Sequence, residues 1–165
     1  MNLKRIARHL LVNRRHVNTA FPRAALASIE RAIQAGETTH SGQVRFAVEG
    51  ALDGSPLFQG HSSRRRALDL FAQLHIWDTE HNNGVLIYVL LADRAVEIVA
   101  DRGIQSRVGS QAFESICRAM EAAFKRGDFE GGLIRGVDAV SLRLAEHFPA
   151  SGEHANELSN KPVVL

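Results

Sequence analysis

The chain has 165 residues and a formal net charge of +2, with 45% apolar and 23% charged residues. These proportions suit one ordinary globular domain and exclude an intrinsically disordered chain. The longest uninterrupted apolar run covers the nine residues 84–92, about half the roughly 18 that a membrane-spanning helix needs. The sequence therefore predicts neither a membrane span nor a second full domain.

The charge is unevenly distributed along the chain. Residues 1–31 hold seven Lys or Arg against one acid, Glu30, whereas residues 32–165 hold 13 against 17. Basic residues in the first 20 positions interrupt any apolar stretch that a secretory signal would need, so no signal peptide is predicted. We expect a cytoplasmic protein, with peripheral attachment to the inner face of the membrane as an alternative role for the basic N-terminus.

Residues 1–20 are predicted to form a basic amphipathic helix followed by a linker. Apolar side chains recur there at helical spacing, opposite basic ones, and they are Leu3, Ile6, Ala7, Leu10 and Leu11. The polar residues 13–19 predict a break after this helix. Three interpretations are open: the apolar stripe packs on the domain, lies on an anionic membrane surface, or binds a membrane-protein complex. Nucleic acid is not expected as a partner, because the positive charge is confined to this one segment.

The main domain is predicted over residues 21–148. Its first helix, residues 22–36, begins at a proline and ends at a glycine, a common arrangement at helix ends. Alternating apolar and polar residues over 43–49 predict a strand with one wetter face or at a sheet edge. A glycine-rich loop then leads to a helix with Ser62 as its N-cap.

The second half of the domain begins with its most apolar segment. Residues 85–91 are typical of a central strand covered on both faces, and residues 95–100 predict an antiparallel third strand. Two amphipathic helices follow, one behind Ser110 and one behind Asp128 as N-cap. The polar segment 149–165 shows no periodicity and is predicted to be a flexible tail.

The order of these elements determines which loops meet. A strand–helix–strand unit makes a right-handed crossover, so the first two strands are parallel and the third is antiparallel. The predicted α/β fold brings three loops together at one sheet edge, namely residues 40–42, 81–84 and 101–103. The opposite edge collects residues 49–50, 61–64 and 93–94.

Motifs along the chain resemble those of a known family. They are the run Ile76-Trp-Asp-Thr-Glu-His-Asn-Asn-Gly-Val-Leu-Ile, then Asp93-Arg94, Val96, Ile98 and Gly103, and finally Phe124-Lys-Arg-Gly-Asp-Phe129 with Gly132 and Gly136. In this order and spacing, residues 21–148 resemble the TPM domain, the family of the thylakoid-lumen acid phosphatase, the photosystem II repair factor and the levamisole-receptor modulator. The chain looks like a short, soluble, bacterial-type member. The resemblance implies a three-layer α/β/α sandwich around a small mixed, mainly parallel central sheet.

The resemblance also implies divalent-cation binding and, as in some relatives, weak phosphatase activity. The family's Asp-Asn-Gly loop corresponds to Asn82-Asn83-Gly84 here, so its acid is replaced by an amide. Asp101 lies in the loop where the family has Gly-aromatic-Gly. We interpret Asp101 as a carboxylate that compensates at the same edge.

Oxygen-bearing side chains near this edge are the candidate ligands of calcium or magnesium, which prefer carboxylate, amide and carbonyl oxygens. They are Asp78, Glu80, Asn82, Asn83 and Asp101. A second interpretation stays open, in which Asn83-Gly84 supplies turn geometry and Asp101 caps a short helix near residues 104–108.

Arginines at both edges are candidate anion-binding residues. Next to a cation that polarises a phosphoryl oxygen, Arg94 or Arg102 would stabilise phosphoryl charge, and His81 or His40 would transfer protons. Arg64, in a run of three arginines at a helix start, is a further phosphate ligand or else a solvated side chain. No P-loop or other phosphatase motif is present. We therefore expect at most slow hydrolysis of small phosphoesters, with unknown catalytic residues, and a non-catalytic membrane-associated interaction module as the alternative.

Overall fold

The computed structural model of the protein describes residues 3–152 and 156–165. Residues 1–2 of the predicted N-terminal segment and residues 153–155 of the predicted tail lie outside the described residues. Across the described ranges, no helix combines the length and the apolar character that crossing a bilayer requires.

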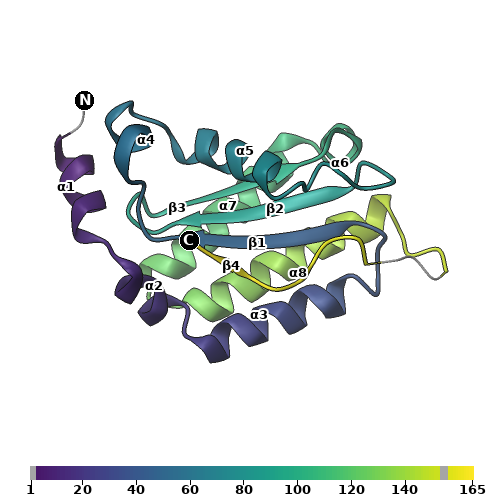
Figure 1. Cartoon of the computed structure of the whole chain (residues 1–165). Helices are drawn as coiled ribbons and strands as arrows, with labels where there is room; N and C mark the ends of the chain where they lie inside the picture. The colour runs from purple at the N-terminus through teal and green to yellow at the C-terminus, as the bar shows by residue number, and fades with distance from the viewer. Residues whose placement is uncertain (1–2, 153–155) are drawn as a thin grey trace.

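A mixed sheet forms the centre of the molecule (Figure 1). Its strands are β1 (Gln43–Glu49), β2 (Gly84–Leu90), β3 (Ala95–Ala100) and β4 (Val163–Val164), in the spatial order β3-β2-β1-β4. β2 and β4 both run parallel to β1, whereas β3 is antiparallel to β2. The predicted arrangement of the first three strands is confirmed.

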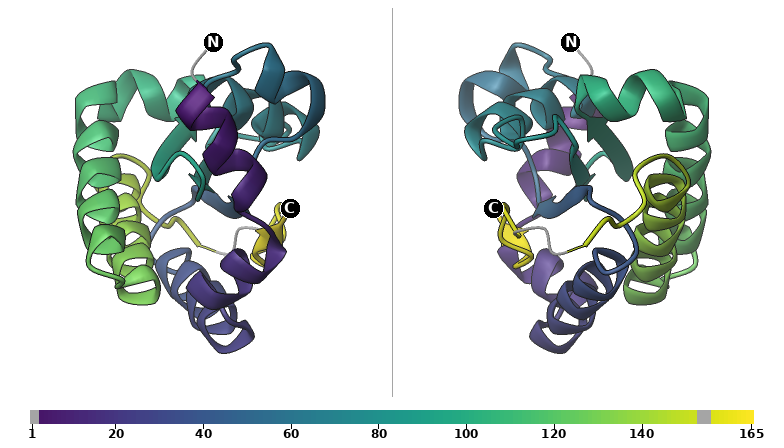
Figure 2. Two further views of the ribbon diagram at one scale, coloured as in Figure 1. Left: turned by 90° about the vertical axis from the view of Figure 1, so that its left-hand side faces the viewer. Right: turned by 90° about the vertical axis from the view of Figure 1, so that its right-hand side faces the viewer.

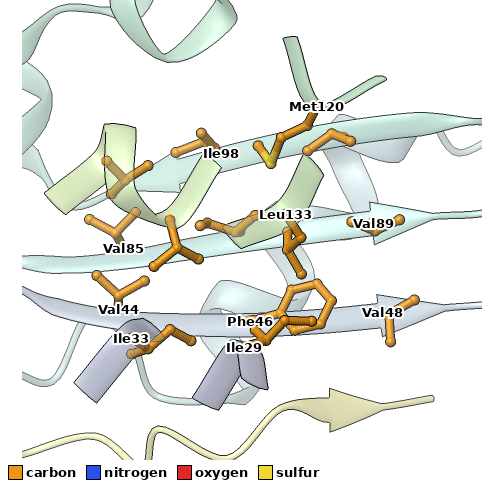
Figure 3. Close-up of a cluster of buried hydrophobic side chains, with 14 of the residues drawn as sticks. Ile29, Ile33, Val44, Phe46, Val48, Val85, Val89, Ile98, Met120 and Leu133 are labelled. Carbon is orange, nitrogen blue, oxygen red and sulfur yellow. The ribbon is translucent and has the colours of Figure 1, made fainter. Parts of the chain in front are cut away.

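Helices cover both faces of the sheet. One face packs against α3 (Arg23–Gly36), α7 (Ser110–Lys125) and α8 (Phe129–His147), and the other against α4 (Gly54–Phe58) and α5 (Ser63–Gln73). Successive side chains of a strand point to opposite faces, so each strand contributes to two cores. Phe46 faces Ile29 and Ile33 of α3 (Figure 3), whereas its neighbour Ala47 packs on the α5 side. The three-layer α/β/α sandwich is confirmed.

β1 is an interior strand, and the prediction of an edge or a wetter face was wrong. Gln43 and Glu49 are only 2% and 8% exposed. Their polar groups are nevertheless paired, because Gln43 Oε1 accepts from the backbone N–H of Glu157 and Glu49 accepts from Arg66. Alternating polarity predicts solvent only when the polar side chains have no partner inside the protein.

The segment predicted as a polar break is mostly helical. α1 (Leu3–Leu11) is followed closely by α2 (Arg14–Ala20), which begins behind Asn13. The side-chain oxygen of Asn13 accepts from the Arg15 N–H at 3.0 Å, and the Asn13 N–H donates to His16 Nδ1 at 3.3 Å. This reciprocal capping stabilises the helix start, and it outweighs the poor apolar periodicity of a seven-residue helix.

The C-terminal segment returns to the sheet as a fourth strand that the sequence did not predict. Val163 and Val164 pair with Ala47 and Val48, and the Leu165 N–H donates to the Val48 carbonyl at 2.9 Å. A two-residue strand is too short to show a period of two. Its contribution is to cover the open side of β1 with backbone hydrogen bonds.

Candidate functional site

The three loops predicted to share one sheet edge do meet there. The Gln43 N–H donates to the Asn83 carbonyl at 3.0 Å, and the Asp101 N–H donates to the Gly84 carbonyl at 2.9 Å. The side-chain amide of Asn83 donates to the Ser41 carbonyl at 2.7 Å. Asn83 therefore lies between the two other loops, and we call this region the loop edge: residues 40–42, 78–84 and 101–103.

Asn83, like His40, is a polar residue of the loop edge with no exposed surface. It is fully buried, and its N–H donates to the Thr79 hydroxyl at 3.1 Å. Its side-chain oxygen Oδ1 is also buried but receives no hydrogen bond from the described residues. A buried amide oxygen without a donor is energetically costly.

Asp101 repeats this pattern on the neighbouring segment. Its Oδ1 accepts from the Arg102 N–H at 2.6 Å and caps the helix α6 (Arg102–Val108). Its second oxygen, Oδ2, is buried and has no hydrogen-bond partner in the described part of the chain. The predicted capping role is thus confirmed, and capping leaves one carboxylate oxygen available for another ligand.

The other three predicted ligands lie at the surface of the same loop. Asp78, Glu80 and Asn82 are exposed. Asn82 adopts a positive φ of 50°, so the left-handed residue of this turn is Asn82 rather than Asn83 or Gly84. Among the residues that the structure describes, no three His, Cys, Asp or Glu side chains form a metal-binding group.

Glu157 is a carboxylate near the loop edge that sequence reasoning missed. Its Oε2 accepts from the Glu80 N–H at 2.9 Å, and its own N–H donates to Gln43 Oε1 at 2.9 Å. These contacts bring the C-terminal segment beside the predicted cation loop. No local pattern could have revealed it, because the two residues are separated by 77 positions.

Two glycines allow the loops to approach closely. A side chain at Gly84 would overlap the carbonyl oxygen of Ile76, and a Cβ at Gly103 would lie 2.8 Å from the carbonyl oxygen of Asn82. Neither glycine has a left-handed φ. Both positions therefore require glycine for space, which keeps the backbones of the loop edge in contact.

The predicted anion-binding arginines and proton-transferring histidines do not form one site. Arg64 donates to the Ile98 carbonyl at 2.5 Å and lies 3.9 Å from Glu97, so it is not simply solvated. Arg102 and His81 are exposed at the loop edge, whereas His40 is fully buried there. Arg94 is exposed in the β2–β3 turn, at the opposite edge.

A buried charged network organises that opposite edge. Glu49 receives two hydrogen bonds from Arg66, at 2.8 and 3.0 Å, and one from the Tyr88 hydroxyl at 2.6 Å. Burial, followed by the charge of Glu49, raises the pKa of Tyr88, and the hydrogen bond to Glu49 raises the pKa of Arg66. Tyr88 and Arg66 therefore remain donors, and all three groups support the fold.

α1 is docked through its polar side at the same edge. Arg5 donates to both carboxylate oxygens of Asp93, at 2.7 to 3.1 Å, and His9 Nε2 lies 3.0 Å from Asp93 Oδ1. His9 is buried, and its Nδ1 accepts from the Leu52 N–H at 2.9 Å. The hydrogen on the His9 ring is therefore placed at Nε2, where it donates to Asp93.

Most of the apolar stripe of α1 faces away from the domain. Leu3, Leu10 and Leu11 are 73%, 71% and 73% exposed, and Ile6 is the α1 residue that packs against the α5-side core. Figure 2 shows α1 on the outside of the molecule, at one end of the sheet. Of the three interpretations of this helix, packing of the whole stripe on the domain is therefore wrong.

Lowering the pH is expected to weaken the docking of α1. Burial alone would raise the pKa of Asp93, but hydrogen bonds from Arg5 and His9, together with the charge of Arg5, hold that pKa below its usual value. Asp93 therefore stabilises docking above its unfolded pKa, near about 4, and this contribution is lost as the pH falls through the lower folded value.

Amide NMR between pH 7 and pH 3 measures this release. Resonances of α1 should move toward disordered positions only below about pH 4, and Asp93→Asn should loosen α1 already at pH 7. The matched variant Asp53→Asn removes an exposed carboxylate that makes no capping hydrogen bond and should leave α1 in place. Unchanged α1 resonances in Asp93→Asn would show that Asp93 does not hold the helix.

Comparisons with known proteins agree with this fold. A model of the TPM domain family matches residues 18–142. The chain is similar to the BA42 protein of the psychrophilic bacterium Bizionia argentinensis, seen by NMR, with 30% identity over 86% of this chain and 92% of that one and a TM-score of 0.73. The N-terminal domain of a P. gingivalis protein shares the fold, with a TM-score of 0.61. It has 20% identity to this chain, over 80% of this chain and 82% of that one.

Among curated proteins no sequence matches the chain. The family match extends over most of the chain, from the middle of α2 into α8, and includes the whole loop edge. Its range agrees with the resemblance drawn from residues 21–148. The chain belongs to the TPM domain family.

Proposed function

We propose that the loop edge binds a divalent cation, calcium or magnesium, and that any phosphatase activity there is weak. The observation that carries the proposal is a pair of buried oxygens on adjacent segments, Asn83 Oδ1 and Asp101 Oδ2, which have no hydrogen-bond partner among the residues that the structure describes. A polar atom that loses water without gaining a partner is destabilising. A hard cation supplies the missing partner for both kinds of oxygen.

The donor set suits a cation of modest affinity. Asp101 supplies one full negative charge, and the amide of Asn83 supplies a neutral oxygen already oriented by its bond to Ser41. Asp78, Glu80 and Asn82 lie exposed on the same loop, where they can attract the ion or hold it through water. With few charged ligands, the expected dissociation constant is about 0.1–1 mM.

A titration of the full chain tests cation binding. Trp77 is the only tryptophan and directly precedes Asp78, so its fluorescence should change saturably with CaCl₂ or MgCl₂. Asp101→Asn keeps a good capping side chain but removes the charge, and it should weaken binding by about tenfold or more.

The control variant is Asp138→Asn, an exposed carboxylate on α8 far along the chain from the loop edge. It changes the net charge by the same amount and should bind as the wild type does. Equal affinities of the Asp101 and Asp138 variants would remove the loop edge as the binding site.

The proposal also includes an activity of the bound cation, the weak hydrolysis of phosphomonoesters. A bound divalent cation would polarise a phosphoryl oxygen and lower the pKa of a coordinated water. Arg102 is exposed at the start of α6, where it can attract a phosphate group. Activity on p-nitrophenyl phosphate should be slow, should disappear with a chelator and should fall in Asp101→Asn; activity insensitive to both changes would refute this part.

The outward face of α1 favours a second candidate function, association with an anionic membrane surface. Its three exposed leucines, Leu3, Leu10 and Leu11, adjoin Lys4 and Arg8, which are also exposed. Apolar side chains beside cations are the features of a helix that lies in a membrane interface. A helix of nine residues gives reversible attachment at most.

Sedimentation with vesicles tests this candidate. The wild type should sediment with vesicles that contain phosphatidylserine and less with neutral phosphatidylcholine vesicles. The double variant Leu10→Ser/Leu11→Ser should lose this binding, whereas Leu142→Ser, which replaces a leucine 60% exposed on α8, should keep it. Equal sedimentation of the two variants would exclude α1 as the membrane contact.

A further inference from the structure

A large pocket lies at the end of the sheet opposite the loop edge. Its volume is about 690 Å³, and its walls come from α2, the end of β2, the β2–β3 turn and the α7–α8 junction. Pockets for small molecules are typically about 300–1,000 Å³. We call it the α2–α7 pocket. Its lining includes none of the loop-edge residues that form the proposed cation site.

The inner surface of the α2–α7 pocket is apolar and partly aromatic. Val89 contributes from the end of β2, Leu91 from the turn that follows, and Phe124 and Phe129 from the α7–α8 junction. The two phenylalanine rings stack, with centroids 5.1 Å apart and planes at 26°. Such a surface favours an apolar ligand body, and flat rings pack well against aromatic side chains.

The rim of the pocket is basic. Arg15 and His16 from α2, Arg94 from the β2–β3 turn and Lys125 from α7 are all exposed at this pocket. The acid in the lining is Glu121, whose Oε1 accepts from the Val96 N–H at 3.0 Å. The rim therefore carries at least three positive charges against one negative charge.

Three of the rim cations form no ion pair with the part of the chain that the structure describes. In residues 3–152 and 156–165, no carboxylate forms an ion pair with Arg15, Arg94 or Lys125. By contrast, the arginines of the neighbouring α5 run, Arg64, Arg65 and Arg66, all lie within ion-pair distance of carboxylates. Available cations around an apolar pocket complement a ligand with an anionic group.

The position of Arg94 at the rim depends on Asp93, the residue before it. Its φ is 54°, a conformation that is uncommon for a residue other than glycine, asparagine or aspartate. Asp93, the preceding residue, is fixed by Arg5 and His9 of α1. The docked α1 therefore anchors the turn that presents Arg94 to the pocket.

We propose that the α2–α7 pocket binds a small aromatic carboxylate, with its ring on the Phe124 side and its carboxylate at the Arg94 and Lys125 rim. The apolar lining favours an aromatic ring, and the rim cations, which have no ion-pair partner among the described residues, favour a negative charge. The proposal is independent of the cation site, since it uses no residue of the loop edge.

Amide NMR of the full chain, titrated with 1-naphthoate, tests the proposal. Saturable shifts are expected at Phe124, Lys125 and Arg94. The neutral analogue 1-naphthalenemethanol lacks the charge and acetate lacks the ring, so each should bind about tenfold more weakly or worse. Added salt should weaken naphthoate binding.

Neighbouring residues provide a matched pair of variants. Lys125 lines the pocket, whereas the next residue, Arg126, is exposed but does not. Lys125→Gln and Arg94→Gln should each weaken naphthoate binding by about three- to tenfold, while Arg126→Gln should not change it. The proposal is overturned if naphthoate causes no saturable shift, if the shifts map elsewhere, or if the neutral analogue binds equally well.

Discussion

Replacing Glu49 by alanine is expected to lower the free energy of unfolding by about 3–5 kcal/mol. Glu49 is 8% exposed and receives hydrogen bonds from Arg66 and the Tyr88 hydroxyl. Its removal leaves the buried hydroxyl without an acceptor and a mostly buried guanidinium without its counter-charge. The larger part of the loss comes from these two stranded donors.

Urea unfolding followed by circular dichroism measures this loss. Glu114→Ala is the matched control, because Glu114 pairs with Arg118 at 3.8 Å but both side chains are 64% exposed; its effect should be below about 1 kcal/mol. Replacing the whole network, as Glu49→Leu with Arg66→Leu and Tyr88→Phe, should be much less damaging than Glu49→Ala alone. A loss below about 1 kcal/mol for Glu49→Ala would refute the network's importance.

Gly84→Ala is expected to be the most damaging small substitution at the loop edge. The added methyl group would overlap the Ile76 carbonyl oxygen, and both groups belong to closely packed backbone that cannot rotate away. Crowding of this kind costs about 1–3 kcal/mol. The substitution should also displace Asn83, the adjacent residue, and so weaken cation binding.

Gly60→Ala is the control variant, because it introduces backbone strain without the crowding that Gly84→Ala causes. Gly60 has a φ of 71° and nothing within 4 Å of the position of a Cβ, so alanine there costs about 1–2 kcal/mol of conformational strain without a clash. Thermal unfolding of the two variants measures the difference, and only Gly84→Ala should affect the loop-edge amides in NMR spectra. If the Gly84→Ala spectrum stays as the wild type's, the close approach of the loops is not required.

The sequence predicted the central strands and the meeting of loops because these follow from strong, local patterns. The continuous apolar run predicted β2, the right-handed crossover predicted its parallel pairing with β1, and the tight turn at residues 93–94 predicted the antiparallel β3. Asp101 was recognised both as a candidate ligand and as a helix cap. The structure shows that one of its oxygens caps α6, while the other has no hydrogen-bond partner within residues 3–152 and 156–165.

The features that the sequence did not predict depend on contacts between distant residues. The interior position of β1 follows from partners of Glu49 and Gln43 that lie elsewhere in the chain. Glu157 reaches the loop edge only because the C-terminal segment turns back along β1. The sequence also did not predict that the apolar face of α1 points outward, because an amphipathic pattern does not show which side of a helix contacts the domain.

Anomalous X-ray diffraction from crystals of the full chain soaked in MnCl₂ would locate the cation, since manganese binds the oxygen ligands that magnesium and calcium prefer. Cation binding at the loop edge predicts an anomalous peak within about 2.6 Å of Asn83 Oδ1 or Asp101 Oδ2. The peak should disappear in Asp101→Asn crystals and persist in Asp138→Asn crystals. No peak at saturating manganese, or a peak bound only by residues outside the loop edge, would show that the two buried oxygens do not form a cation site.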